Sequence, residues 1–428
     1  MDILDKLVDG AYGFSSPLSV VLCGACLIVG TCFLPVLRMR GNYHAIGPKC
    51  RPDKPLNGAV AQAKITSLRI YPVKSCAGHE VEQATLAERG LDMDRLWMVI
   101  DGGGRFMSQR RCAKMALVSP SLPRTKDEPL ILSAPGMDSL EVPVMHEVGP
   151  GGPSAGGEVL QVEVWSSTCK AIDQGNAAAK WLGEFLGRED LRLVRMQDGF
   201  VRPTDPAYGT GFRASFADGF PMLLAAEESL EELNSRMAVA GGEAVGMERF
   251  RPNNQAQACV GSVFELHSIT VGQLHPSAGS LPSCGARPTC CLLPSRPGRR
   301  RDGSPGHEFD VHTFFCGATS IVVRGWGAFA EDNWTKIRVG GMNMRTPKPC
   351  SRCKIPRINQ STLEVLQEPR KTLNTFRAGS HVTPWKEKWA KDVFFGMNVL
   401  HESVGVLRVG DEVDVLRVVC ETSAKKTQ

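Results

Sequence analysis

The sequence has little excess charge of either sign. Its 50 Lys and Arg residues face 45 Asp and Glu residues, which leaves a formal net charge of +5. Such a balance does not predict a surface that coats nucleic acid, and no RNA- or DNA-binding signature accompanies it. We therefore expect no nucleic-acid partner, and anionic ligands only at particular places.

Three common redox signatures are also missing. The sequence has no Gly-rich dinucleotide loop, no cysteine run typical of iron–sulfur clusters, and nothing that resembles a haem domain. Any redox chemistry would therefore need separate electron partners.

An uncharged stretch lies close to the N-terminus. Residues 17–37, PLSVVLCGACLIVGTCFLPVL, are long enough as a helix to span about 30 Å of hydrocarbon. The preceding residues are acidic on balance, which argues against a cleaved signal peptide. Positive charges follow the stretch instead, so the positive-inside rule predicts a single-pass anchor with the large C-terminal part in the cytosol; these residues are Arg38, Arg40, Lys49, Arg51 and Lys54. A buried core helix is the alternative.

This topology constrains the 15 cysteines. Cys23, Cys26 and Cys32 fall in the apolar stretch, where they act as small apolar residues. The others would face a reducing cytosol, so a disulfide framework is not expected.

Short strands with turn signals and few helices predict a mixed α/β, β-barrel-rich fold. Residues 63–73 read as a strand, 95–110 as a hairpin with a glycine turn, 159–173 as one further strand, and 405–418 as two strands joined by a turn. Helical spacing appears at 175–187, with Trp181, Phe185 and Leu186 on one side, and again at 228–237.

One segment does not fit a compact domain. Residues 254–320 are rich in Gly, Pro, Ser and Cys, lack sustained periodicity and contain the basic run RPGRRR. A disordered insertion that the fold tolerates is the favoured interpretation, because loop length costs only logarithmically. A functional lid, a basic binding loop, or translated intron sequence are the alternatives.

The pair of cysteines in KPCSRCKIP, residues 348–356, carries the most informative chemistry. Structural zinc needs four ligands, and no second suitable pair is available outside the doubtful segment. A thioredoxin-type dithiol would follow a strand and open a helix, whereas prolines bracket this pair. The remaining interpretation is a single thiolate whose pKa is lowered by Lys348, Arg352 and Lys354, and such a soft ligand suits a redox-active metal.

Other stretches carry groups that bind anions. YPVKSC places Lys74 and Ser75 after a strand, LDMDRLW contains Arg95, and MERFRPNN contains Arg249, Arg251 and Asn253. Each could be a solvated surface residue. Together, guanidinium groups with Ser and Asn donors are suited to fixing a phosphate and a flat heteroaromatic ring.

These stretches, taken in order, resemble a known family. ITSLRIYPVKSCAGHEVEQATLAERGLDMDRLWMVID is similar to the N-terminal β-barrel domain that precedes MOSC domains. RFRPN, EDNWTKIRVG, KPCSRCKIP and FFGMNVL are similar to the MOSC domain itself. With the N-terminal anchor, the chain resembles the mitochondrial amidoxime-reducing components, which are molybdenum enzymes of the outer mitochondrial membrane.

The resemblance implies a division into parts. Residues 1–16 form a short tail, 17–37 the transmembrane helix and 38–63 a linker. The N-terminal MOSC-type β-barrel domain then covers 64–200, and the MOSC domain covers 201–418 with the insert at 254–320. Residues 419–428 form a C-terminal tail.

The resemblance also implies a molybdenum cofactor, Mo-molybdopterin. Its metal would be bound by the thiolate of Cys353, with Cys350 as a neighbour. Asp218, in FADGFP, matches an acidic residue near the metal pocket, although a turn or helix-cap Asp is an equal alternative. The positions that match those holding the pterin and its phosphate are Lys74, Ser75, Arg95, Arg251, Asn253, Ser351 and Arg352.

The implied reaction is the two-electron reduction of small N-hydroxylated compounds such as amidoximes, hydroxylamines and N-oxides. Electrons would come from cytochrome b5 and its NADH-dependent reductase, and the outer mitochondrial membrane is the expected location, with the endoplasmic reticulum as an alternative. Two rival interpretations remain: a MOSC protein that carries sulfur to the molybdenum cofactor, and a non-catalytic membrane-tethered homologue disabled by the insert.

Two departures from the family pattern bear on the site. The insert begins directly after Asn253, so it could displace Arg251 and Asn253. Gly219, after Asp218, has no side chain where family members often have a hydroxyl.

Overall fold

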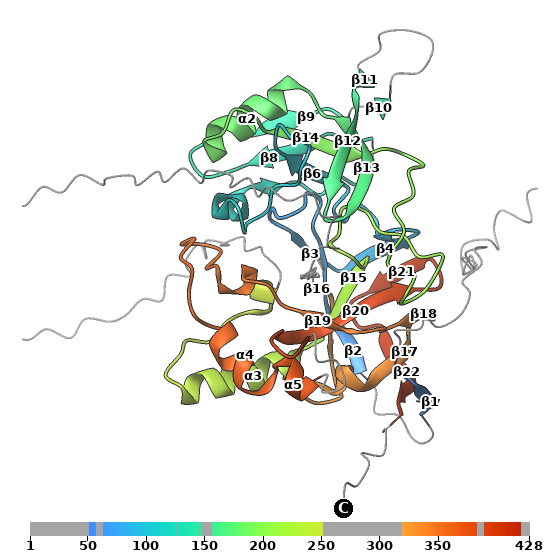
Figure 1. Ribbon diagram of the computed structural model, residues 1–428. Helices are drawn as coiled ribbons and strands as arrows, with labels where there is room; N and C mark the ends of the chain where they lie inside the picture. The colour runs from blue at the N-terminus through green and yellow to red at the C-terminus, as the bar shows by residue number, and fades with distance from the viewer. Residues whose placement is uncertain are drawn as a thin grey trace, which may run out of the picture. The chain divides into compact units, whose positions relative to one another are not determined.

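The computed structural model describes residues 51–56, 63–125, 127–144, 146–147, 156–250, 319–382 and 389–420 (Figure 1). The expected transmembrane stretch at 17–37 lies outside these residues. Within the described part of the chain, no helix combines the length and apolarity needed to cross a membrane.

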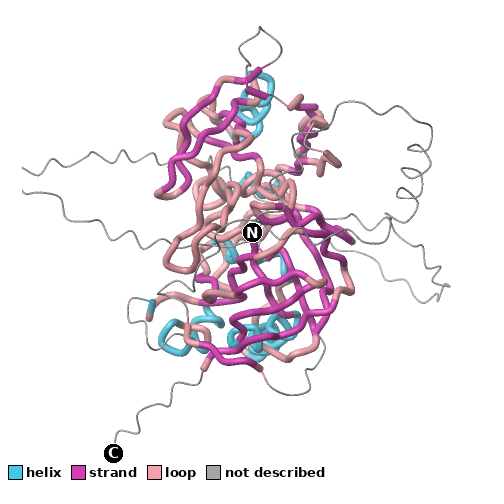
Figure 2. The backbone as a smooth tube through the Cα atoms, turned by 90° about the vertical axis from the view of Figure 1, so that its right-hand side faces the viewer, coloured by secondary structure: helices cyan, strands magenta, loops and turns pink. Residues whose placement is uncertain are grey.

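The main architectural feature is a ring of seven strands that closes on itself. Strand β2 pairs with β16 on one side and with β22 on the other, which closes the ring. In order around the ring the strands are β22 (Glu412–Val419), β17 (Trp334–Val339), β18 (Met342–Arg345), β20 (Phe394–His401), β15 (Met222–Ala226), β16 (Thr319–Arg324) and β2 (Ala63–Ile70). Figure 2 shows these strands in magenta. The predicted β-barrel-rich fold is therefore confirmed.

Three short strands extend this sheet. β1 (Asp53–Pro55) pairs with β22, β3 (His79–Val81) with β2, and β19 (Pro349–Ser351) with β20. β20 thus lies between the cysteine-bearing strand β19 and strand β15. This neighbourhood positions the candidate site.

The two faces of the central strands are both covered, which explains why β15 and β20 are buried along their whole length. Val399 packs into the main core, whereas Phe395 on the same strand packs on the other side with Leu233 and Leu373. Those two leucines come from α3 (Glu227–Val239) and α4 (Arg370–Phe376), which lie near α5 (Gly379–Val382) in Figure 1. Period-two alternation is lost in such strands because neither face meets water.

The second sheet belongs to the N-terminal half. Its order is β12 (Val159–Val164), β13 (Ser167–Asp173), β14 (Arg192–Met196) and β6 (Trp97–Ile100). Helix α2 (Asn176–Leu186) contacts β14, and its buried residues include the expected Trp181, Phe185 and Leu186. Gly187, in the left-handed conformation with φ of 72°, ends the helix.

Smaller elements complete the described fold. They are β4 (Gln83–Ala87) and β5 (Gly90–Leu91) with β21 (Gly405–Arg408); β7 (Ser119–Pro120), β8 (Leu130–Ser133) and β9 (Leu140–Val142); β10 (His146–Glu147) with β11 (Gly156–Gly157); and the 3-10 turns η1 (Ala113–Leu117), η2 (Met247–Phe250), η3 (Ala330–Asn333) and η4 (Ile355–Arg357).

The structure corrects three expectations from the sequence. Residues 159–173 form a hairpin, not one strand, because the chain reverses at Trp165 and Ser166 between the paired Val164 and Ser167. The second strand expected in 95–110 is reduced to isolated bridges, because Phe106 pairs with Ile100 of β6 while its neighbour Arg105 pairs with Glu163 of β12. The expected insert end at 320 overlaps β16, which begins at Thr319, while residues 251–318 lie outside the described part.

Candidate functional site

The two cysteines of KPCSRCKIP lie at the end of β19. Both cysteines are buried, with exposures of 0% for Cys350 and 7% for Cys353. The backbone N–H of Ile355 donates to Cys353 Sγ at 3.4 Å. The chain thus turns directly after Cys353 and directs a backbone donor at its sulfur.

The cations of this loop do not all act on the same thiol. Arg352 Nη1 lies 3.3 Å from Cys350 Sγ, the neighbour of the expected ligand Cys353, so its charge acts on Cys350. Lys354 is exposed. Lys348 Nζ lies over the rings of Tyr208, Phe220 and Trp389, at 5.2, 5.7 and 5.3 Å from their centres. The lowering of a thiol pKa by these three cations stays a prediction.

Ser351, between the two cysteines, carries a buried hydroxyl. Its residue is 7% exposed, and Oγ has no hydrogen-bond partner among the described residues. A buried polar group without a partner is costly and calls for an explanation such as a bound ligand. Ser351 lies two positions before Cys353 in the sequence, as expected for a residue whose hydroxyl helps to bind a group held by the Cys353 thiol.

The start of the RFRPN motif packs against the cysteine loop. Arg352 Nη2 donates to the Phe250 carbonyl oxygen, and Arg249 Nε donates to the Pro356 carbonyl oxygen at 2.8 Å. The Phe250 ring stacks on Phe395 of β20, with 3.8 Å between ring centres. The predicted site residues Arg251 and Asn253 follow Phe250 directly but lie outside the described residues.

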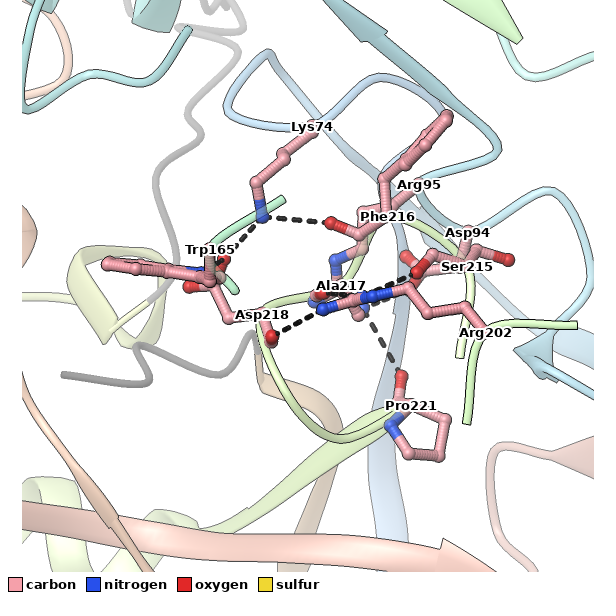
Figure 3. Close-up of polar contacts among 10 residues, drawn as sticks. All are labelled: Lys74, Asp94, Arg95, Trp165, Arg202, Ser215, Phe216, Ala217, Asp218 and Pro221. Carbon is pink, nitrogen blue, oxygen red and sulfur yellow. Dashed lines mark hydrogen bonds and ion pairs between the residues drawn. The ribbon is translucent and has the colours of Figure 1, made fainter. Parts of the chain in front are cut away.

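Lys74 and Asp218 form a buried ion pair (Figure 3). Lys74 Nζ donates to Asp218 Oδ1 and, at 2.8 Å, to the Phe216 carbonyl oxygen, while Trp165 Nε1 donates to Asp218 Oδ1 at 3.1 Å. Burial lowers the pKa of Lys74 to about 8, although Asp218 opposes this shift. Burial would raise the pKa of Asp218, but Lys74, Arg110 and the hydrogen bonds from Lys74 and Trp165 hold this pKa below its usual value.

Arg202 holds the segment that carries Asp218, and the sequence did not suggest it. Its Nη1 donates to the carbonyl oxygens of Ser215, at 2.8 Å, and Ala217, and its Nη2 donates to that of Asp218 at 2.9 Å. Figure 3 shows the guanidinium enclosed by this segment. Burial lowers the pKa of Arg202. No periodic pattern marks such a residue, because its partners are backbone atoms of a loop.

Of the predicted residues Ser75 and Arg95, Arg95 also supports the segment that carries Asp218, whereas Ser75 contacts Gln109. Arg95 Nη1 pairs with Asp94 and donates to the Pro221 carbonyl oxygen at 3.3 Å, and the Arg95 carbonyl oxygen accepts the N–H of Phe216. Burial raises the pKa of Asp94 to about 6, against the attraction of Arg95. The carbonyl of Ser75 accepts from Gln109 Nε2 at 3.1 Å. The charge of Arg95 is therefore already partnered within the protein.

The cysteine loop and the Asp218 segment meet through Lys348 and Phe220. Lys348 begins the cysteine motif, and the Phe220 ring under its ammonium group lies two positions after Asp218. The structure thus brings Lys74, Arg95 and Asp218 together, places Ser351, Arg352 and Cys353 on the adjoining loop, and leaves Arg251 and Asn253 undescribed. Among the described residues, no group of three or more His, Cys, Asp or Glu side chains could hold a metal ion.

Two family models match separate parts of the chain. The MOSC N-terminal beta barrel domain matches residues 62–189, and the MOSC domain matches residues 315–414. The chain is 26% identical over 369 residues to "Mitochondrial amidoxime-reducing component 1" of Mus musculus, covering 84% of this chain and 82% of the relative. It is 26% identical over 358 residues to "Mitochondrial amidoxime reducing component 2" of Homo sapiens, covering 82% of each.

The name of a third relative indicates a different function. "Molybdenum cofactor sulfurase" of Danio rerio is 26% identical over 354 residues, covering 82% of this chain but 34% of the relative. All three similarities extend over both matched domains of this chain. The chain therefore belongs to the family of MOSC-domain proteins with an N-terminal MOSC β-barrel domain, and the resemblance to the amidoxime-reducing components that its motifs predicted is confirmed.

Proposed function

We propose that this protein is a molybdenum-cofactor-dependent reductase of N-hydroxylated compounds such as amidoximes, hydroxylamines and N-oxides. The observation that carries the proposal is the buried thiol of Cys353, two positions after Ser351, whose buried hydroxyl has no partner among the described residues, within the MOSC-domain match. A soft thiolate is a suitable ligand for a redox-active metal.

The available side chains fit a metal whose ligands come mostly from an organic cofactor and not from the protein. The described residues contain no cluster of protein side chains that could enclose an ion, whereas one thiol and one open hydroxyl suit a metal already held by an organic cofactor. When bound, the cofactor would supply the two-electron redox chemistry that no side chain here can provide. Cys353 would hold the metal, and Ser351 would donate a hydrogen bond to the cofactor.

The Lys74–Asp218 pair has the protonation states that the reaction needs. Reduction of an N–O bond consumes two electrons and two protons and releases water. Asp218 is a carboxylate at neutral pH, and Lys74, with a pKa of about 8, is mostly protonated but can release its Nζ proton. We assign Asp218 the catalytic role of holding this proton in place.

The electron donors and the location follow from the resemblance. The proposal includes cytochrome b5 and its NADH-dependent reductase as partners, since no dinucleotide loop or haem signature is present in the sequence. The names of the mouse and human relatives, both mitochondrial amidoxime-reducing components, support a mitochondrial location. The membrane anchor at 17–37 belongs to the same proposal.

Reconstituted turnover tests this function directly. The full chain, loaded with cofactor, is mixed with cytochrome b5, its reductase, NADH and benzamidoxime, and formation of benzamidine is measured. We expect benzamidine to form only when every component is present, and not with Cys353→Ala. Absence of benzamidine with a fully loaded chain would contradict the reductase proposal.

A cofactor sulfur carrier is the second candidate, supported by the similarity to a molybdenum cofactor sulfurase. A carrier would bind the molybdenum cofactor and transfer sulfur to an acceptor enzyme without reducing benzamidoxime. The third candidate, a non-catalytic homologue, would bind no cofactor. Molybdenum content and benzamidine formation, measured on the same preparation, separate the three.

A further inference from the structure

The tip of the β12–β13 hairpin places an indole ring at the candidate site. Trp165 occupies the two-residue turn with φ of 57°, a backbone conformation that large side chains rarely adopt and that such turns usually reserve for Gly or Asn. Strain of this kind persists where the surroundings fix it, often at functional sites. Here the indole N–H donates to Asp218 Oδ1 at 3.1 Å. The strained turn therefore places a hydrogen-bond donor at the Lys74–Asp218 pair.

Arg110 lies over the same ring system. Its Cζ is 4.4 Å from the centre of the Trp165 ring and 6.0 Å from that of Phe106. The two rings are themselves in contact, with centres 5.2 Å apart and planes inclined by 51°. Arg110, Phe106 and Trp165 are all partly exposed. We call these three side chains the cation–aromatic wall.

The N–H donors of the Arg110 guanidinium have no acceptor among the described residues. The guanidinium makes no hydrogen bond or ion pair with any described residue, in contrast to Arg95 and Arg202, whose donors bind Asp94 and backbone carbonyls. Stacking on an indole leaves the N–H groups at the edge of the guanidinium plane. That edge matches a carboxylate, which can accept two parallel hydrogen bonds.

The local charge also favours an anion. Lys74, Arg110 and Arg202 are positive and act on one carboxylate, Asp218, whose pKa the first two help to lower. Because Lys74 already neutralises Asp218, the charge of Arg110 remains uncompensated within this group. An anionic group that approaches the wall is therefore attracted by it.

We propose that Arg110, Trp165 and Phe106 form a substrate subsite for a planar carboxylate, in which the carboxylate pairs with Arg110 and an attached flat ring packs on the aromatic side chains. This inference rests on the proposed function. It names the preferred substrates of that reaction as N-hydroxylated compounds that also carry an aromatic or conjugated carboxylate. Arg110 acts here as a specificity-determining residue.

Two substrates that differ by one carboxylate test the inference. The kinetics of 4-carboxybenzamidoxime and benzamidoxime are compared on the full chain and on Arg110→Gln, with cytochrome b5 and its reductase. We expect a roughly 10- to 100-fold rise in KM for the carboxylate substrate, which corresponds to the loss of a charge-assisted pair. The KM for benzamidoxime should change less, since that substrate lacks the carboxylate, so the ratio of the two KM values measures the pairing.

A matched variant controls for net charge. Arg124→Gln removes the same charge from an exposed arginine of the N-terminal half, and it should leave the ratio of the two KM values unchanged. Equal changes for both substrates in Arg110→Gln would overturn the inference. Loss of molybdenum from Arg110→Gln would also overturn it, because Arg110 would then bind the cofactor.

Equilibrium binding separates this inference from the reductase proposal. Benzoate binding is measured calorimetrically on the full chain, Arg110→Gln and Arg124→Gln, and it requires no turnover. Arg110-dependent binding without reduction of either amidoxime would support the carboxylate subsite and contradict the reductase. Reduction of benzamidoxime with equal benzoate binding by all three proteins would contradict the subsite alone.

Discussion

Lys74 and Asp218 are 144 positions apart in the sequence, yet they form an ion pair whose side chains are only 7% and 10% exposed. The pair joins the loop after β2 to the segment before β15, and Trp165 adds a hydrogen bond from the β12–β13 hairpin. Three separate parts of the chain thus fix one carboxylate.

Removing both charges of this pair should destabilise the fold less than the two single removals added together. Asp218→Asn leaves the Lys74 ammonium buried without a counter-charge, and breaking a buried pair in this way costs about 3–5 kcal/mol. The double variant Lys74→Met/Asp218→Asn removes the unpaired charge as well. We expect its loss of stability, measured by chemical denaturation, to be clearly smaller than the sum of the two single losses.

The same pair predicts a pH effect on Lys74. Without Asp218 the pKa of Lys74 should fall below its present value of about 8, because the attraction that opposes burial is gone. NMR titration of the Lys74 side chain in the wild type and in Asp218→Asn measures this shift. A pKa that rises in the variant would show that the two groups are not paired in solution.

Arg202 should be hard to replace, even by lysine. Arg202→Lys can keep one of the three carbonyl contacts, and each buried acceptor left without a donor costs about 1–3 kcal/mol. Arg213→Lys is the control, since Arg213 forms an exposed pair with Glu88, and exposed pairs contribute at most about 1 kcal/mol. Thermal unfolding should show a fall of several degrees for Arg202→Lys only; equal melting temperatures would argue against the carbonyl contacts.

The regular elements could be predicted from sequence because their signals are local. The helical spacing of Trp181, Phe185 and Leu186 gave α2, and the turn signal before Asp411 separated β21 from β22. The ring of strands is consistent with the short, turn-punctuated runs of the sequence. Its closure by β2 and β22 could not be deduced, since it joins the two ends of the described chain.

The hairpin at Trp165 was missed for a physical reason. VLQVEVWSSTCKAID has no Gly, Asn or Asp at its turn, and these are the residues that normally adopt a positive φ. A tryptophan in that conformation is held by tertiary contacts to Asp218, Phe106 and Arg110. Likewise, the direction of Arg352 toward Cys350 depends on the Phe250 carbonyl, about 100 positions away.

The buried, neutral His401 should lower the free energy of unfolding in acid. This histidine of β20 is 1% exposed, its Nε2–H donates to the Ala87 carbonyl oxygen at 2.7 Å, and burial lowers its pKa to about 4. Between pH 6.5 and 4 the unfolded chain binds a proton that the folded chain does not, so stability falls as the pH falls. The integrated loss is about 3 kcal/mol. His401→Gln, which keeps a donor for Ala87 but cannot titrate, should show a correspondingly flatter dependence of unfolding free energy on pH; identical slopes would contradict a buried neutral His401.

The two cysteines of the KPCSRCKIP loop should differ in their effect on metal content. Cys353→Ala should remove most of the molybdenum, since this variant lacks the proposed metal ligand. Cys350→Ala removes a thiol of similar burial whose neighbour is Arg352, and it should retain molybdenum near the wild-type level. Elemental analysis of the full chain, together with melting temperatures to exclude unfolding, measures both. Loss of metal from Cys350→Ala alone would assign the ligand to the other cysteine.

Ser351→Ala separates ligand binding from folding at the same loop. The Ser351 hydroxyl has no partner among the described residues, so its removal breaks no hydrogen bond there and should leave the melting temperature of the metal-free chain unchanged or slightly higher. If the hydroxyl binds the cofactor, the same variant should lose molybdenum faster than the wild type during dialysis. A lower melting temperature with unchanged metal retention would instead indicate that the hydroxyl has a structural partner in the folded protein. Because Cys353 is intact in this variant, any faster loss reports on the cofactor's hydrogen bond and not on its thiolate.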